Sequence, residues 1–80
     1  MSLKDEIMQS MVDRIAVLFE RDPDEITAEL NFEADLEATS ANLVQVLSAI
    51  EDEYEIMINF HYVRQQETLG ELVDYIVSQA

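Results

Sequence analysis

The scarcity of glycine and proline is the strongest constraint that this sequence places on its fold. Gly70 is the only glycine and Pro23 the only proline among 80 residues, while nearly half of the residues are hydrophobic. Small β-sheet proteins need many tight turns, and tight turns depend on these two residue types. The composition therefore predicts helices with short connections. A chain of this length buries one small core, so we expect a single domain over residues 1–80.

The hydrophobic pattern predicts an all-α fold, a small four-helix bundle with three longer helices and one short one. The first helix is expected from Leu3 to Phe19, where one face is apolar. Pro23 and the acids around it end this helix and begin a long connection. Four apolar residues without a regular period are expected to anchor that connection to the core: Ile26, Leu30, Phe32 and Leu36.

A second amphipathic helix is predicted from about Ser40 to Tyr54. Taken alone, a hydroxyl residue before an apolar helical pattern is most simply an N-cap. The same position also favours a phosphate, because a helix N-terminus has unpaired N–H groups and partial positive charge. The expected buried stripe consists of Leu43, Val46, Leu47, Ile50 and Tyr54.

The segment after this helix is ambiguous. Ile56–Val63 alternates as a β-strand does, but no other segment offers a partner strand, so we predict a loop and a short helix near Phe60–Gln65. Thr68 and Glu71 have the spacing of a capping box and predict the start of the last helix. Its apolar stripe is Leu69, Leu72, Val73, Ile76 and Val77.

The charge balance restricts the possible partners. The chain has 18 acidic and 4 basic residues, a net charge of −14, which disfavours nucleic acid and anionic membranes and favours basic protein surfaces. Between Asp22 and Val63 there is no lysine or arginine, so repulsion is concentrated there and salt should stabilise the fold. We expect no membrane span and, without a signal peptide, a cytoplasmic location.

Catalysis by the bare polypeptide is not expected. Ser40 lacks flanking glycines, and His61 is a lone histidine that we place on the surface or in a loop. The acids near Asp22 do not have the spacing of a calcium loop, and the chain has no cysteine, so no metal site is predicted. The sequence therefore predicts a protein that is not an enzyme.

Three segments resemble acyl carrier proteins. They are Asp35-Leu36-x-Ala38-x-Ser40, Ala49–Tyr54 at the end of the second helix, and Thr68–Ile76 in the last helix. The resemblance implies that Ser40 receives 4′-phosphopantetheine from coenzyme A and that the thiol of this arm carries acyl groups as thioesters. With Ser40 as the attachment residue, Thr39 becomes the predicted cap of the second helix, as Thr68 is of the last.

The resemblance further implies the partners of the chain. They would be a phosphopantetheinyl transferase and acyl-loading and acyl-processing enzymes with basic docking surfaces, acting on a monomer. The implied docking residues are Ala41, Val44, Gln45, Ser48, Glu51 and Asp52. For Val44, the plain alternative is an isolated exposed valine of the kind found on any surface.

The chain departs from the family pattern at four places. The usual Asp-Ser-Leu is Thr39-Ser40-Ala41, Glu37 replaces a glycine, Asn42 and Gln45 replace acids, and the short third helix is aromatic and mildly basic. These departures favour a specialised fatty-acid, lipid or polyketide-type pathway. Two alternatives stay open: an unmodified, carrier-like acidic interaction module, and an aminoacyl or peptidyl carrier.

Overall fold

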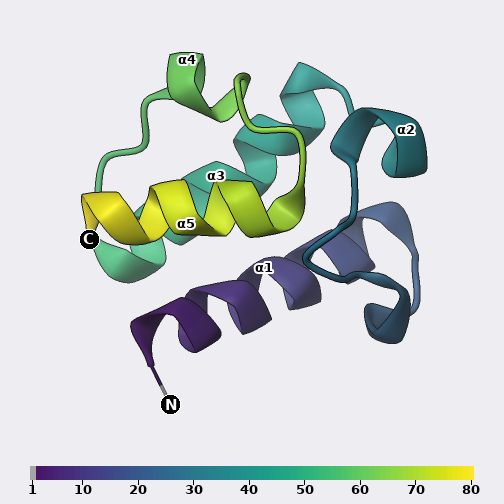
Figure 1. Ribbon diagram of the computed structural model, residues 1–80, viewed down its shortest axis with the longest axis horizontal. Coiled ribbons are helices and arrows are strands. Elements are labelled where there is room, and N and C mark those ends of the chain that lie inside the picture. The colour runs from purple at the N-terminus through teal and green to yellow at the C-terminus, as the bar shows by residue number, and fades with distance from the viewer. Residues whose placement is uncertain (1) are drawn as a thin grey trace.

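The computed structural model describes residues 2–80, and across these residues the fold is helical, as predicted. The three long helices pack around one hydrophobic core, with α5 lying across α3 and α1 beneath them (Figure 1). The two shortest helices lie at the periphery, α2 near the start of α3 and α4 on the far side of α5 from α1. The elements are α1 (Leu3–Phe19), η1 (Pro23–Glu25), α2 (Phe32–Leu36), α3 (Ser40–Tyr54), α4 (Phe60–Val63) and α5 (Leu69–Gln79).

The first helix has the predicted bounds. Ser2 caps it, because its hydroxyl accepts a hydrogen bond from the Asp5 N–H at 3.2 Å. Ile7, Met11 and Ile15 are fully buried. Leu3, which the amphipathic pattern places on the same apolar face, is instead 38% exposed. Leu3 is the first residue of the helix, one turn before the first buried residue, Ile7.

The long connection is more regular than the sequence indicated. It contains a 3₁₀ turn, capped by Asp22, and the five-residue helix α2, which starts where the Asn31 side chain accepts hydrogen bonds from the Glu33 and Ala34 N–H groups at 3.0 and 2.9 Å. Five residues are too few to show helical periodicity in a sequence. The four predicted anchors are all buried: Ile26, Leu30, Phe32 and Leu36.

The connection is tied directly to the start of α5. The Leu69 N–H donates to the Leu30 carbonyl at 2.9 Å, and the Gly70 N–H donates to the Ala28 carbonyl at 2.8 Å. A Cβ atom on Gly70 would lie 3.1 Å from the Ala28 carbonyl oxygen, which is tighter than ordinary van der Waals contact. The one glycine of the chain therefore permits a close approach of two backbones.

Core positions of the two other long helices largely match the predicted stripes. In α5, Leu69, Leu72, Val73 and Ile76 are buried and Val77 is half-buried. In α3 the buried set is shorter than predicted, since Leu43 and Tyr54 are only half-buried. They lie near the two ends of the helix, where fewer elements cover them.

The ambiguous segment forms a loop and a short helix, as predicted, although α4 ends at Val63 and not at Gln65. The loop is held by side chains. The Ile58 N–H donates to the Glu51 carboxylate at 2.9 Å, and the Asn59 N–H donates to the Tyr75 hydroxyl at 3.0 Å. Side chains of α3 and α5 thus replace the missing partner strand.

Candidate attachment site at the start of α3

Thr39 is the cap of α3, as predicted. Its hydroxyl accepts a hydrogen bond from the Asn42 N–H at 3.2 Å, and its own N–H donates to the Asn42 side-chain oxygen at 3.1 Å. The two residues form a capping box that was not predicted, because asparagine stands where glutamate or glutamine usually completes the box. The three-residue spacing between a hydroxyl and a side-chain acceptor was the available signal.

Capping by Thr39 leaves the neighbouring Ser40 hydroxyl unused. Ser40 is the first residue of α3, and its side chain is exposed. Among residues 2–80, neither its hydroxyl nor the N–H groups of Ser40 and Ala41 have a hydrogen-bond partner. The first turn contains no acid. An unused hydroxyl thus lies beside two unpaired N–H donors at the positive end of a fifteen-residue helix.

A cleft of about 470 Å³ adjoins Ser40 and is bordered by α2, α3 and α4. Phe32, Leu43 and Val63 supply its apolar surface. Arg64 lies on its rim, exposed and without an ion pair to any of residues 2–80. Glu33 and Glu67 also border the cleft, so it combines a small apolar wall with one cation, two carboxylates and the Ser40 hydroxyl.

The predicted docking residues share the α3 surface that begins at Ser40, with one exception. Val44 is 47% exposed, a large value for an apolar side chain. Glu51 is half-buried, and its carboxylate is engaged by the Ile58 N–H, so it supports the loop before α4. The other five are exposed: Ala41, Val44, Gln45, Ser48 and Asp52.

Thr68 is also a cap, as predicted. Its hydroxyl accepts from the Glu71 N–H at 3.3 Å, and its N–H donates to the Glu71 carboxylate at 3.1 Å. This box fixes the start of α5, and with it the residues from Arg64 to Glu67 that border the cleft.

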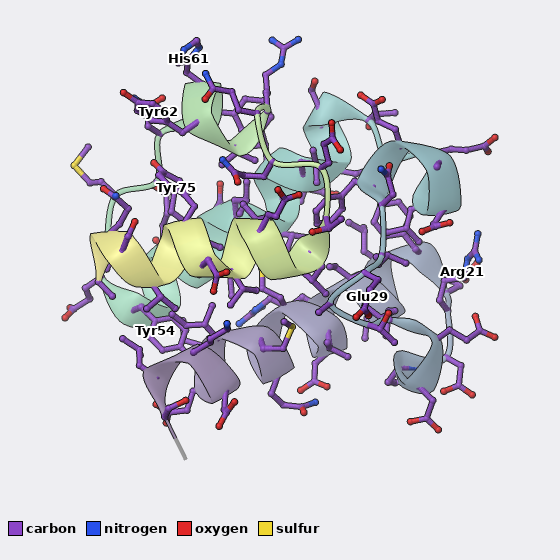
Figure 2. All side chains as sticks on the ribbon, viewed as in Figure 1. Arg21, Glu29, Tyr54, His61, Tyr62 and Tyr75 are labelled. Atoms are coloured by element: carbon purple, nitrogen blue, oxygen red, sulfur yellow. The ribbon has the colours of Figure 1, made fainter. Side chains whose placement is uncertain are left out.

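The aromatic segment of α4 contacts α5 through one pair of rings. The Tyr62 ring lies 5.8 Å from the Tyr75 ring and 5.5 Å from the His61 ring, measured between centroids, and Figure 2 shows the three at one end of the molecule. His61 is exposed, as predicted, and its side chain contacts Gln65 at 3.3 Å. The segment thus has a packing role, while Tyr62 keeps 48% of its surface exposed.

Perturbed ionisable groups lie away from Ser40. Hydrogen bonds from Ser10 and Arg14 lower the pKa of Glu53, and the Asp74 carboxylate raises the pKa of Lys4. Burial, with the nearby Glu53 charge, raises the pKa of Tyr54. Within residues 2–80, no three metal-ligating side chains come together, and no helix is long and apolar enough to cross a membrane.

Comparisons with known proteins agree with this geometry. Residues 9–76 match the sequence model of the family described as phosphopantetheine attachment site. The acyl carrier proteins of Lactobacillus johnsonii and Lactobacillus acidophilus are 36% and 39% identical to the chain over 75 residues, 94% of each protein. The structure of the Enterococcus faecalis acyl carrier protein superposes with a TM-score of 0.81 at 32% identity, covering 99% of this chain and 100% of the other.

Proposed function

Because the chain belongs to the acyl carrier protein family, whose members bear a covalent 4′-phosphopantetheine, we propose that Ser40 is the attachment residue. When attached, the arm supplies the thiol that forms thioesters with acyl groups, which the cysteine-free polypeptide lacks. The observation that carries the proposal is the exposed, unused Ser40 hydroxyl beside the Thr39–Asn42 cap. Acyl carrier proteins carry intermediates and leave catalysis to other enzymes.

The residues around Ser40 suit a phosphodiester. The unpaired N–H groups of Ser40 and Ala41 can donate to phosphate oxygens, and the helix N-terminus favours negative charge. No carboxylate of the first turn opposes it. Arg64, across the cleft, adds the one cation among the cleft residues. The apolar side chains of Phe32, Leu43 and Val63 would border the part of the arm that enters the cleft.

Acyl carrier proteins interact with phosphopantetheinyl transferases and acyl-processing enzymes, and we assign this contact to the α3 surface of Ala41, Val44, Gln45, Ser48 and Asp52. Since the first turn of α3 has no acid, basic enzymes would find the nearest carboxylates of this helix near its end, at the half-buried Glu51 and the exposed Asp52. Val44 would therefore contribute more of the contact than charge does.

The replacements around Ser40 support a specialised role. An uncharged first half of α3, Ala41 after the serine and Arg64 on the cleft rim favour partner enzymes other than those that recognise an acidic helix. We therefore propose a specialised fatty-acid, lipid or polyketide-type pathway. We further propose a monomer in the cytoplasm, where the thiol of the arm would stay reduced.

The second candidate is an unmodified interaction module with the same fold. It is favoured by one observation, the absence of an acid before Ser40 and of a large apolar residue after it. An aminoacyl or peptidyl carrier would share Ser40 as attachment residue and differ only in its cargo.

Intact mass after enzymatic modification tests the attachment residue. We would incubate the protein with coenzyme A and a broad-specificity phosphopantetheinyl transferase, using the wild type, Ser40→Ala and the matched control Ser48→Ala, an exposed serine of the same helix. We expect an arm-sized mass gain in the wild type and in Ser48→Ala only. Unmodified wild type after several transferases, including that of the source organism, would leave the interaction module as the better assignment.

A further inference from the structure

A second, larger groove lies between α1 and α3. It measures about 730 Å³ and shares none of its lining residues with the cleft beside Ser40. The two helices run in opposite directions (Figure 1), so the groove follows their contact. Ser10 and Ala49 are small residues on its walls, which leaves room for side chains of another molecule.

One end of this groove is apolar and uncovered. Val46 is 4% exposed and lies at its base, and Leu18 and Ala49 are half-buried beside it. Val17, at its edge, is 80% exposed, although valine is a residue that usually loses most of its surface on folding. A partner that covered Val17 and Leu18 would therefore remove apolar surface from water.

The walls of the groove are acidic. Glu6, Asp13 and Glu53 carry three negative charges and Arg14 one positive charge, a net charge of −2 for the lining. The Arg14 guanidinium is already paired, since it donates to the Glu53 carboxylate at 3.1 Å, and the Ser10 hydroxyl donates to the same oxygen at 2.8 Å. The Asp13 carboxylate accepts a hydrogen bond from the Gln9 side chain at 2.9 Å, and among residues 2–80 neither Glu6 nor Asp13 forms an ion pair. The groove thus offers an apolar base with carboxylates at its sides that can still pair with cations.

We propose that the α1–α3 groove binds an amphipathic helix of a partner protein, with an apolar stripe flanked by lysine or arginine. A long groove between two helices suits the apolar stripe of a third helix. The basic flanks would pair with Glu6 and Asp13. A second copy of this chain is disfavoured because each copy carries −14, and a fatty-acid carboxylate would meet the acidic walls.

This proposal is independent of the arm on Ser40, so the test uses the full chain with Ser40→Ala. The probe is a synthetic helical peptide with leucine at three- and four-residue spacing and lysine on both flanks. A second peptide keeps every lysine and replaces each leucine by serine, which reports attraction to the acidic surface alone. We expect saturable binding of the leucine peptide, with NMR amide shifts concentrated at Val17, Leu18 and Ala49, and little binding of the serine peptide.

Two exposed apolar residues provide a matched pair of variants. Val17→Gln should lower the affinity for the leucine peptide about tenfold, because the complex would no longer bury one valine side chain. Met57→Gln, 86% exposed and outside the groove, should leave the affinity unchanged. Both sites are exposed, and thermal unfolding of the variants checks that they fold. Equal binding of the two peptides, or of Val17→Gln and the parent, would overturn the proposal.

Other occupants of the groove would appear in the same experiments. Amide shifts centred on Val44 would place the peptide on the docking surface of α3. Self-association that Val17→Gln abolishes would identify a second copy as the occupant, and displacement of the peptide by dodecanoate would identify an acyl chain. Each of these three results would overturn the assignment to a basic helix.

Discussion

Glu37 occupies a backbone conformation that suits glycine. Its φ angle is 52°, in the left-handed region, and it ends α2 two residues before the Thr39 cap. A residue with a Cβ atom pays about 1–2 kcal/mol for this conformation. Its carboxylate also lies at the negative end of the helix. Glu20 and Glu55 end α1 and α3 in the same way.

We expect Glu37→Gly to raise the free energy of unfolding by about 1 kcal/mol, because glycine adopts the left-handed conformation without the steric cost. Urea unfolding measures the change. Glu37→Gln is the matched control: it removes the charge and keeps the Cβ atom, so it should recover only a minor part of the gain. An equal gain from both variants would assign the cost to charge and contradict the backbone argument.

Gly70 presents the opposite case, since alanine is normally preferred in a helix. We expect Gly70→Ala to lower stability by up to about 1 kcal/mol, because the new Cβ would press on the Ala28 carbonyl, which is itself held by the Gly70 N–H. The gain in helix propensity is small at the second residue of α5. Thermal unfolding measures the change in stability. Adding Ala28→Gly to the Gly70→Ala variant should reduce the loss of stability, because it removes the Ala28 Cβ, which would lie 3.2 Å from the added atom.

At the scale of elements, the sequence predicted what periodicity or a cap defines. The bounds of α1, the Thr39 and Thr68 caps and the four loop anchors could be read from residue types and spacing. Helix α2 could not, because its five residues are too few to show a helical period beside the Asn31 cap. The hydrogen bond from the Ile58 N–H to the Glu51 carboxylate could not be predicted either, because it depends on how the loop folds back onto the end of α3.

The first turn of α3 allows the family pattern to be restored without loss of the cap. Aspartate is as good an N-cap as threonine and adds favourable charge at a helix N-terminus. We therefore expect Thr39→Asp with Ala41→Leu to keep or raise stability and to speed arm attachment by a broad-specificity transferase several-fold, measured as mass gain over time. An unchanged attachment rate in the double variant would show that these two positions do not limit recognition.

Thr39→Ala, which loses the cap, should lower the free energy of unfolding by about 1 kcal/mol.

At the scale of the whole molecule, repulsion among 18 acids opposes folding, and only a few local contacts use a carboxylate to join distant elements. Lys4 pairs with Asp74 at 2.8 Å and links α1 to α5, while Arg14 and Ser10 hold Glu53 and link α1 to α3. Among residues 2–80, the other carboxylates form no ion pair, and most of them are exposed. Protonating an acid therefore has opposite effects on stability, depending on whether that acid is paired.

Glu53 tests this distinction through pH. Its pKa is lowered in the folded state, first by the Ser10 hydroxyl and then by Arg14, so its contribution is present above the unfolded pKa and is lost as pH falls through the folded value. We expect Glu53→Gln to lower stability at pH 7 by less than about 1 kcal/mol, as is usual for an exposed pair. The difference from wild type should shrink as pH falls through the lowered folded-state pKa, because the wild-type carboxylate then becomes protonated too.

Asp52 is the matched control for this comparison, because it is the neighbouring acid on α3 and makes no ion pair with any of residues 2–80. Asp52→Asn removes the same charge without breaking a contact, so at pH 7 it should leave stability unchanged or raise it by relieving repulsion. Thermal unfolding of the two variants and the wild type between pH 3 and pH 8 gives the three curves. Equal destabilisation by both variants at pH 7 would mean that the contacts of Glu53 with Ser10 and Arg14 add no stability to the packing of α1 on α3. A loss of stability in Glu53→Gln together with a gain in Asp52→Asn would show that the first carboxylate stabilises the fold and the second only repels its neighbours.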